Sequence, residues 1–277
     1  IIINKSKHYI EVSDCIELLK KIPNNSIDLV IADPPYNINI AEWDNYDNYI
    51  DWAKNWISEV YRVLTPTGNF IVFGGLQFSN STGGDLLEIV HYIRHNSKFN
   101  LVNMIVWYYK NGITAHRFFA NRHEEIMWYA KSNKYYFNLD AVRVKYDEKT
   151  LSLYKKDKRL SHSKLELGKN PTNVWEISRL NSNSKERVGH KTQKPSAIIT
   201  RLVASLTPSN GIVLDLFAGS GITAKTCIEL GRNSINCDID NNFLLFFNKQ
   251  KAKIESTYSY KITNLNEVLD FGKEENI

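Results

Sequence analysis

The sequence predicts an α/β fold around a mostly parallel sheet. Short apolar segments typical of buried strands alternate with segments whose apolar residues recur at helical spacing, and this alternation is typical of parallel sheets. Several of the strand-like segments stop at Asp, Pro or Gly residues, which mark strand ends. With 277 residues, the chain is long enough for one large domain with an additional lobe.

The first half of the chain contains most of the expected sheet. The expected strands are 8–12, 27–32, 69–73, 101–108 and 125–130, and the expected helices are 15–22 and 49–64. Ser13 or Asp14 can cap the first helix, because the side-chain oxygen of either residue can accept a hydrogen bond from a free amide of the first turn.

The regular alternation stops near residue 132 and resumes near residue 195. The later expected elements are the helices 196–206 and 221–230 and the strands 211–216 and 234–237. We therefore divide the chain into a first half of the main domain (1–131), an irregular inserted region (132–194), a second half of the main domain (195–260) and a tail (261–277). The tail has weak signals, and we expect it to be loosely ordered.

The positive charge of the chain is concentrated in the inserted region. Residues 141–194 contain 14 Lys and Arg but only 6 Asp and Glu, whereas the whole chain has a formal net charge of +5. A solvated basic surface explains this segment about as well as a surface that faces a phosphate backbone. Charge alone does not decide between the two.

The cysteines and the hydropathy pattern exclude several classes of protein. Cys15, Cys227 and Cys237 lie far apart without the spacing of a metal site, so we expect reduced thiols in a cytoplasmic protein and no bound zinc. The sequence contains no run of eighteen apolar residues, which argues against a membrane span. The first residues also lack the pattern of a signal peptide.

The strongest local signal is Asp33-Pro34-Pro35-Tyr36, which follows an expected buried strand. Ligands of open α/β sheets bind beyond such strand ends. The prolines fix the backbone, so the Asp33 carboxylate and the Pro34 carbonyl can each accept one N–H of an exocyclic amine while Tyr36 stacks on the base. Such an amine is a poor nucleophile because its lone pair is delocalised into the ring, and two fixed acceptors favour a pyramidal nitrogen. A simple turn explains Asp-Pro or Pro-Pro alone, but it explains the four residues together poorly.

A second signal lies at a later strand-to-helix junction and is rich in glycine. Its residues are Asp215, Phe217, Ala218, Gly219, Ser220, Gly221 and Thr223. The glycines let the backbone approach a ligand, and the helix start offers free amides. Asp238 ends the next expected strand, where its carboxylate can accept the two hydroxyls of a ribose. Taken alone, the glycine loop could be half of a dinucleotide-binding fingerprint, and Asp238 could be a solvated acid at a strand end. Together, the two features predict a nucleoside-containing cofactor.

Other residues can border the same site. Asp14 and Cys15 follow the first strand, although a helix cap explains Asp14 equally well. The stretch 190–195, which contains Lys194, precedes the helix that leads to the glycine loop and can close over one end of the cofactor. Asp33 can border the cofactor as well. Trp43 and Trp52 are more typical of core or lid anchors than of base-stacking residues.

In their order along the chain, these motifs resemble the beta-ordered group of DNA amino-methyltransferases. In that group the Asp-Pro-Pro-Tyr element comes first, the target-recognition region second and the Phe-x-Gly-x-Gly cofactor loop last, and the resemblance covers about residues 8–245. It implies a doubly wound, mostly parallel, seven-stranded methyltransferase-type sheet with a circularly permuted motif order. It also implies S-adenosylmethionine as cofactor and, because Asp33 rather than Ser begins the tetrapeptide, methyl transfer to adenine N6 with the base flipped out of the duplex.

Four segments resemble the RsrI-like adenine methyltransferases of restriction–modification systems more closely. They are 111–125, 156–160, 168–175 and 183–195. This resemblance implies double-stranded DNA as partner and GAATTC as the first site to test. Homodimers and a cognate restriction endonuclease for the same site are further implied partners. The candidate DNA-binding residues are Arg117, Arg122, Lys156, Lys158, Arg159, Arg179 and Arg187.

Several other functions remain open at this point. A related methyltransferase could act on cytosine N4, RNA or a protein glutamine, although Asp rather than Asn at position 33 argues against glutamine. A non-catalytic DNA-binding relative should have degraded motifs, and the motifs here are intact. A nicotinamide dehydrogenase should carry its glycine loop after the first strand rather than at Gly219.

Overall fold

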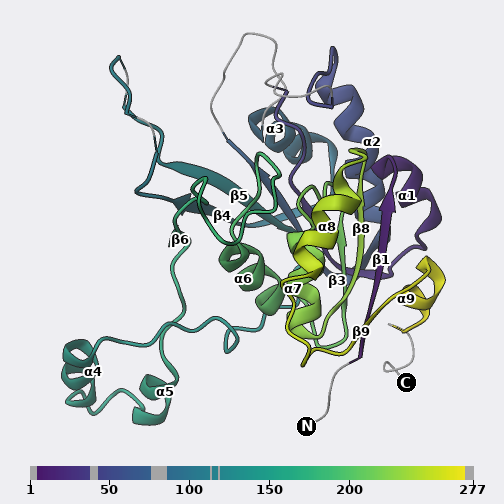
Figure 1. Cartoon of the computed structure of the whole chain (residues 1–277). Coiled ribbons are helices and arrows are strands. Elements are labelled where there is room, and N and C mark those ends of the chain that lie inside the picture. Colours follow the sequence, from purple (N-terminus) through teal and green to yellow (C-terminus); the bar gives the residue numbers. More distant parts are fainter. Residues whose placement is uncertain (1–4, 38–42, 76–85, 113, 118, 272–277) are drawn as a thin grey trace.

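Nine strands form one sheet in the computed structural model, which describes residues 5–37, 43–75, 86–112, 114–117 and 119–271 (Figure 1). The strands are β1 (Ser6–Val12), β2 (Ile27–Ala32), β3 (Leu64–Gly74), β4 (Asn100–Tyr108), β5 (His123–Ala130), β6 (Val174–Glu176), β7 (Ile212–Asp215), β8 (Asn233–Asp238) and β9 (Tyr260–Ile262). Their spatial order is β6-β4-β5-β3-β2-β7-β8-β1-β9. Only β5 pairs antiparallel, with β3 and with β4, and the other described pairings are parallel.

Helices cover both faces of this sheet (Figure 1). The helices are α1 (Cys15–Lys21), α2 (Tyr49–Val63), α3 (Leu86–Asn96), α4 (Glu148–Lys155), α5 (His162–Leu167), α6 (Ser196–Leu206), α7 (Ile222–Leu230), α8 (Phe243–Lys251) and α9 (Leu265–Phe271). Helices α1, α2, α3 and α9 share one hydrophobic core with the sheet, and α6 and α7 share another. The predicted doubly wound, mostly parallel α/β fold is confirmed. Seven strands form its centre, and the three-residue strands β6 and β9 extend the two edges.

The apolar sequence of β2 follows from its position between the two cores. Val30 and Ala32 point into the core beneath α1 and α2, whereas Leu29 and Ile31 point into the core beneath α6 and α7. A strand that is covered on both faces reads as a continuous apolar run rather than as an alternating one. This arrangement fixes where β2 ends and therefore where the residues after it begin.

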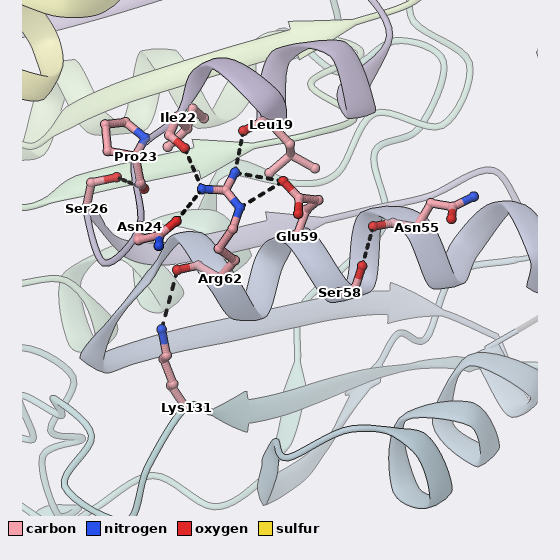
Figure 2. Close-up of polar contacts among 10 residues, drawn as sticks. All are labelled: Leu19, Ile22, Pro23, Asn24, Ser26, Asn55, Ser58, Glu59, Arg62 and Lys131. Carbon is pink, nitrogen blue, oxygen red and sulfur yellow. Dashed lines mark hydrogen bonds and ion pairs between the residues drawn. The ribbon is translucent and has the colours of Figure 1, made fainter.

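Arg62 of α2 holds the end of α1 in place (Figure 2). Its guanidinium donates hydrogen bonds to the carbonyl oxygens of Leu19 at 2.7 Å and Ile22 at 2.8 Å, and to the carboxylate of Glu59 at 2.7 Å. Carbonyls in the last turn of a helix lack intrahelical partners, and a cation there also complements the helix dipole. At the other end, Asp14 caps α1 by accepting from the Ile16 amide at 2.8 Å, as predicted.

The inserted region is irregular but not without structure. Helices α4 and α5 lie in an arm that extends away from the sheet, and β6 returns the chain to the sheet edge beside β4 (Figure 1). The expectation of a loosely ordered tail is wrong for the described residues up to 271. There β9 pairs with β1, and Val268 and Leu269 of α9 are buried in the core.

Three further findings apply to the described ranges. Within them, no three His, Cys, Asp or Glu side chains are grouped so that they could hold a metal ion. None of their helices is both long enough and apolar enough to cross a membrane. Cys15, Cys227 and Cys237 are buried free thiols.

Candidate active site

Four parallel strands end side by side at one edge of the sheet. They are β2, β7, β8 and β1, with Ile31 opposite Asp215, Asp215 opposite Asn236, and Val12 opposite Asp238. The predicted motifs follow directly after these strand ends. Pairing of β2 with β7 therefore brings the Asp-Pro-Pro-Tyr element beside the glycine loop, although most of the chain separates them in sequence.

A cavity at this edge contains most of the predicted site residues. The predicted residues that line it are Asp14, Cys15, Asp33, Pro34, Pro35, Tyr36, Lys194, Phe217, Gly219 and Asp238. A smaller cavity shares Asp33, Lys194 and Gly219 with the first and is lined in addition by Asp215, Ala218, Ser220 and Thr223. Gly221 lies in the same loop but lines neither cavity.

The side chains of the Asp-Pro-Pro-Tyr element form a connected polar group. The Tyr36 hydroxyl donates to Asp33 Oδ1 at 2.9 Å, and Lys194 Nζ lies 2.9 Å from Asp33 Oδ2 and 3.2 Å from the Tyr36 hydroxyl. The Pro35 carbonyl accepts a hydrogen bond from the buried Tyr49 hydroxyl at 2.7 Å. No described residue donates to the Pro34 carbonyl, so this oxygen can accept a hydrogen bond from a ligand.

Burial sets the protonation states of these groups. Burial and the Asp33 charge raise the pKa of Tyr36 well above its usual value, so the phenol stays neutral. Burial alone would lower the pKa of Lys194, but the carboxylates of Asp33 and Glu124 outweigh it and the pKa is raised. Lys194 is therefore a buried cation, and its side chain is only 8% exposed.

The glycine loop depends on backbone conformations that glycine adopts without strain. Gly219 has φ +43° and Gly221 has φ +74°. A Cβ atom at Gly219 would lie 2.9 Å from the His190 ring, and one at Gly221 would lie 3.1 Å from Phe247 Cα. Glycine is therefore required both for the turn and for the close approach of neighbouring residues.

Asp238 organises this loop in addition to lining the cavity. Its Oδ2 accepts a hydrogen bond from the Gly219 amide at 2.7 Å, and its Oδ1 accepts from the Asp240 amide at 2.8 Å. Each carboxylate oxygen has a second lone pair, so Asp238 can also accept from a ligand hydroxyl. The predicted ribose contact is compatible with this position and stays a prediction.

An aromatic wall of the cavity was only partly anticipated. Trp43 and Trp52 line the cavity, and Tyr46, which is not among the predicted residues, stacks on Trp52 with ring centroids 4.3 Å apart. Trp52 also contacts Phe217 of the glycine loop, at 5.8 Å between centroids. No sequence signal marks Tyr46 apart from its position shortly before an amphipathic helix.

Asp215 is buried behind the glycine loop and gives a testable pH dependence. Burial raises the pKa of Asp215 to about 7, whereas an unfolded aspartate has a pKa of about 3.9. The folded chain therefore holds the proton more tightly, and the contribution of this group to stability declines as the pH rises from about 4 through about 7.

We expect Asp215→Asn to remove this decline, because asparagine stays neutral and can still accept from the Phe217 amide, which lies 3.1 Å from Asp215 Oδ1. The melting temperature of the variant minus that of the wild type should be larger at about pH 8 than at about pH 5. Equal differences at both pH values would contradict this role of Asp215. Asp51→Asn, on the exposed side of α2, serves as the control.

A cavity of about 300 Å³, which we call the second cavity, shares Tyr36 and Lys194 with the first. Glu124 and two of the predicted DNA-binding residues, Arg179 and Arg187, line it as well. The Arg179 guanidinium lies over the Tyr109 ring, 4.7 Å from its centroid. Arg187 is half-buried and donates to carbonyl oxygens of its own loop, including that of His190 at 3.0 Å.

The other predicted DNA-binding residues lie in two separate places. Arg117 and Arg122 belong to the connection between β4 and β5, where Arg117 is exposed. Lys156, Lys158 and Arg159 are exposed on the arm that carries α4 and α5, and Arg159 pairs with Asp157 at 2.6 Å. The structure thus brings Arg179 and Arg187 to the second cavity but places the arm residues away from it (Figure 1).

Comparison with known sequences gives a consistent result. Residues 27–250 match the DNA methylase family of N6 and N4 enzymes. The type II methyltransferase M.ScaI of Streptomyces caespitosus is 35% identical, over 83% of this chain and 77% of its own length. The DNA adenine methyltransferase YhdJ of Escherichia coli (strain K12) is 33% identical, over 87% of this chain and 81% of its own length.

Solved structures show the same fold at lower sequence identity. The PvuII DNA methyltransferase, which is cytosine-N4-specific, superimposes with a TM-score of 0.68 and 17% identity, over 98% of this chain and 93% of that chain. The complex of M1.HpyAVI with S-adenosylmethionine gives a TM-score of 0.62 and 21% identity, over 88% of this chain and 98% of that chain.

Proposed function

This chain belongs to the N6/N4 DNA methylase family and uses S-adenosylmethionine, and we propose that it methylates the N6 amino group of adenine in duplex DNA. One observation carries the proposal. The Asp33 carboxylate and the open Pro34 carbonyl lie at the end of β2, where the cavity beside the glycine loop meets the second cavity at Tyr36 and Lys194. A base amine held there faces the cofactor site.

The first cavity has the chemistry that this cofactor requires. When bound, S-adenosylmethionine supplies an electrophilic methyl group on its sulfonium centre. Asp238 is placed to accept from the ribose hydroxyls, and the aromatic wall of Tyr46, Trp52 and Phe217 offers flat apolar surface to the adenine of the cofactor. The buried Cys15 thiol lines the same cavity, and its burial raises its pKa, so the thiol stays protonated.

The residues after β2 activate the amine. Asp33 and Pro34 accept its two N–H groups, and Tyr36 packs against the base. The amine nitrogen gains positive charge as it bonds to the methyl carbon, whose bond to the cofactor sulfur would break with the electron pair left on sulfur, and Asp33 then takes one of the amine protons. Acceptors that are already in place stabilise this charge without reorganisation, which is the main source of catalysis in such a site.

Adenine rather than cytosine is supported by Asp33 at the head of the tetrapeptide and by the adenine specificity in the name of YhdJ. Labelled methyl transfer from S-adenosylmethionine to duplex DNA, followed by analysis of the nucleosides, tests the proposal. N6-methyladenine is the expected product. N4-methylcytosine as the sole product would replace the proposal with the cytosine alternative, and no labelled nucleoside would favour a non-catalytic DNA-binding relative.

The inserted region, 132–194, is the proposed target-recognition region between the catalytic half (1–131) and the cofactor-binding half (195–260). Its excess of Lys and Arg supports contact with phosphates. We propose GAATTC as the first site to test. The name of the type II methyltransferase M.ScaI supports a restriction–modification setting. We propose with it a cytoplasmic location, a homodimeric methyltransferase and an endonuclease for the same site.

The N6 atom of an adenine that is stacked within a duplex is inaccessible to Asp33. The adenine must therefore leave the base stack. Phe119 is suited to assist, since its side chain is 99% exposed in the β4–β5 connection between Arg117 and Arg122. Proteins that unstack DNA often insert an exposed apolar side chain between base steps. Such a residue stabilises the opened duplex rather than the chemistry.

We expect Phe119→Ala to lower the single-turnover rate on duplex DNA by about tenfold, because opening the stack costs a few kcal/mol. An abasic site opposite the target adenine should restore the rate, since it removes the pairing that must be broken. Leu153→Ala, an exposed apolar residue on α4, is the control. Equal loss on both DNAs would show that Phe119 does not assist opening.

A further inference from the structure

A second carboxylate lies next to the Asp-Pro-Pro-Tyr element and has no role in the proposed chemistry. Glu124 is the second residue of β5, and its side chain is only 21% exposed. Its Oε2 atom is buried without a hydrogen-bond partner. A buried carboxylate oxygen that no donor satisfies is costly, so its retention at this position calls for a functional reason.

Lys194 lies between this carboxylate and Asp33. Its Nζ atom is 2.9 Å from Asp33 Oδ2 but 3.7 Å from Glu124 Oε2, which is too long for a hydrogen bond. The ammonium also lies 5.4 Å from the centroids of the Tyr36 and Phe73 rings, whose faces can stabilise a cation along this path. The cation is therefore hydrogen-bonded to Asp33 and forms a longer ion pair, without a hydrogen bond, with Glu124.

The position of Lys194 Nζ beside Asp33 Oδ2 conflicts with the role of Asp33 as an acceptor for the amine. A substrate amine gains positive charge during methyl transfer, and an ammonium bound to Asp33 both offsets the charge of the carboxylate and repels the amine nitrogen. A small movement of Lys194 Nζ toward Glu124 Oε2 removes this conflict. The same movement gives Glu124 Oε2 the hydrogen bond that it lacks. One movement therefore both releases Asp33 and satisfies Glu124.

We propose that Glu124 is a positioning residue that draws Lys194 away from Asp33 when the target base enters, so that Asp33 meets the amine with its full negative charge. This inference rests on the proposed function, because it concerns the same amine. Glu124 acts through Lys194 and does not itself contact the reacting atoms. In the free protein, Lys194 forms an ion pair with the carboxylate of Asp33.

Burial and the nearby Asp33 charge raise the pKa of Glu124, while Lys194 opposes the rise. Arg179 also faces this carboxylate from the loop after β6 and acts in the same direction as Lys194. Movement of the ammonium toward Glu124 therefore favours the charged form of Glu124 and strengthens the pair that holds Lys194 off Asp33.

The test uses Glu124→Gln in the full chain, because glutamine keeps the shape and removes the charge. We expect kcat at saturating S-adenosylmethionine and DNA to fall by about tenfold, while the dissociation constants of both stay within about twofold, since the contact matters only as the amine reacts. Glu124→Asp, which keeps the charge, should recover most of kcat. Glu17→Gln, on the exposed face of α1, is the matched control.

A double-mutant cycle with Lys194→Met separates this role from a direct contact with the base. If Glu124 acts through Lys194, Glu124→Gln should cause no further loss in the Lys194→Met background. A tenfold loss that persists there, or a wild-type kcat in Glu124→Gln, would overturn the inference. If the Lys194→Met variant fails to bind cofactor, the comparison of Glu124→Gln with Glu124→Asp still tests the inference, because neither variant changes Lys194. Failure of the wild type to methylate DNA would instead contradict the proposed function.

Discussion

Replacing Asp33 with alanine is expected to reduce methyl transfer by about 1,000-fold while the chain still binds S-adenosylmethionine. Asp33 is the charged member of the pair that accepts the amine N–H groups, and removal of one preorganised electrostatic contact costs about 100- to 1,000-fold in kcat. The contacts of Asp238 with the Gly219 and Asp240 amides do not involve Asp33 and are not altered. Single-turnover transfer of labelled methyl groups and calorimetric titration of the cofactor measure the two effects.

Asp33→Asn refines this prediction, because it keeps an acceptor oxygen but removes the charge. It should be nearly as inactive as Asp33→Ala if the charge is what matters. Asp51→Asn, in an exposed ion pair on α2, controls for the loss of a surface carboxylate. Turnover within about tenfold of the wild type in Asp33→Ala would remove Asp33 from its assigned role.

Asp238→Ala should weaken S-adenosylmethionine binding by about 100-fold. The substitution removes the proposed ribose contact and also leaves the Gly219 and Asp240 amides without their 2.7 and 2.8 Å acceptors. Hydrogen bonds to a charged group contribute about 1.5–3 kcal/mol each, and a factor of ten corresponds to about 1.4 kcal/mol. The rate at saturating cofactor should remain close to that of the wild type, because Asp238 does not contact the amine.

Asp240→Ala provides a neighbouring control for Asp238. Asp240 Oδ1 accepts a hydrogen bond at 2.8 Å from the amide of Asn242, the residue before α8, and Asp240 does not line the cavity. Its loss should leave the cofactor affinity within about twofold of the wild type. A dissociation constant for Asp238→Ala that matches that of the wild type would contradict the ribose contact.

The buried elements of the main domain could be predicted closely from the sequence. The expected strand 27–32 coincides with β2, and the expected helix 196–206 coincides with α6. Both elements contribute to the cores on the faces of the sheet, so burial imposes an apolar pattern that can be read locally.

Elements that depend on distant contacts could not be predicted. The three-residue strand β6 exists because β4 offers a free edge, where Val106 pairs with Val174. In α9, Val268 and Leu269 pack into a core formed mostly by the first part of the chain. Segments this short carry little periodic signal of their own and are stabilised mainly by tertiary contacts.

The motif residues of the site could be predicted, but their partners could not. The pairing of Lys194 with Asp33 joins the end of the inserted region to the first half of the main domain, and no local pattern encodes it. Glu124 and Glu125 look equivalent in the sequence, yet alternation along β5 directs them to opposite faces. Glu124 lines the second cavity, whereas Glu125 pairs with His123 at 2.7 Å.

Base-resolved sequencing of DNA from cells that express this chain tests the central claim most directly, because it reports the modified base and its sequence context together. Cells that express the Asp33→Ala variant provide the matched background. We predict N6-methyladenine at one recurring sequence in the wild-type sample and none above background in the variant. N4-methylcytosine alone, or adenine methylation that is equal in both samples, would contradict the claim.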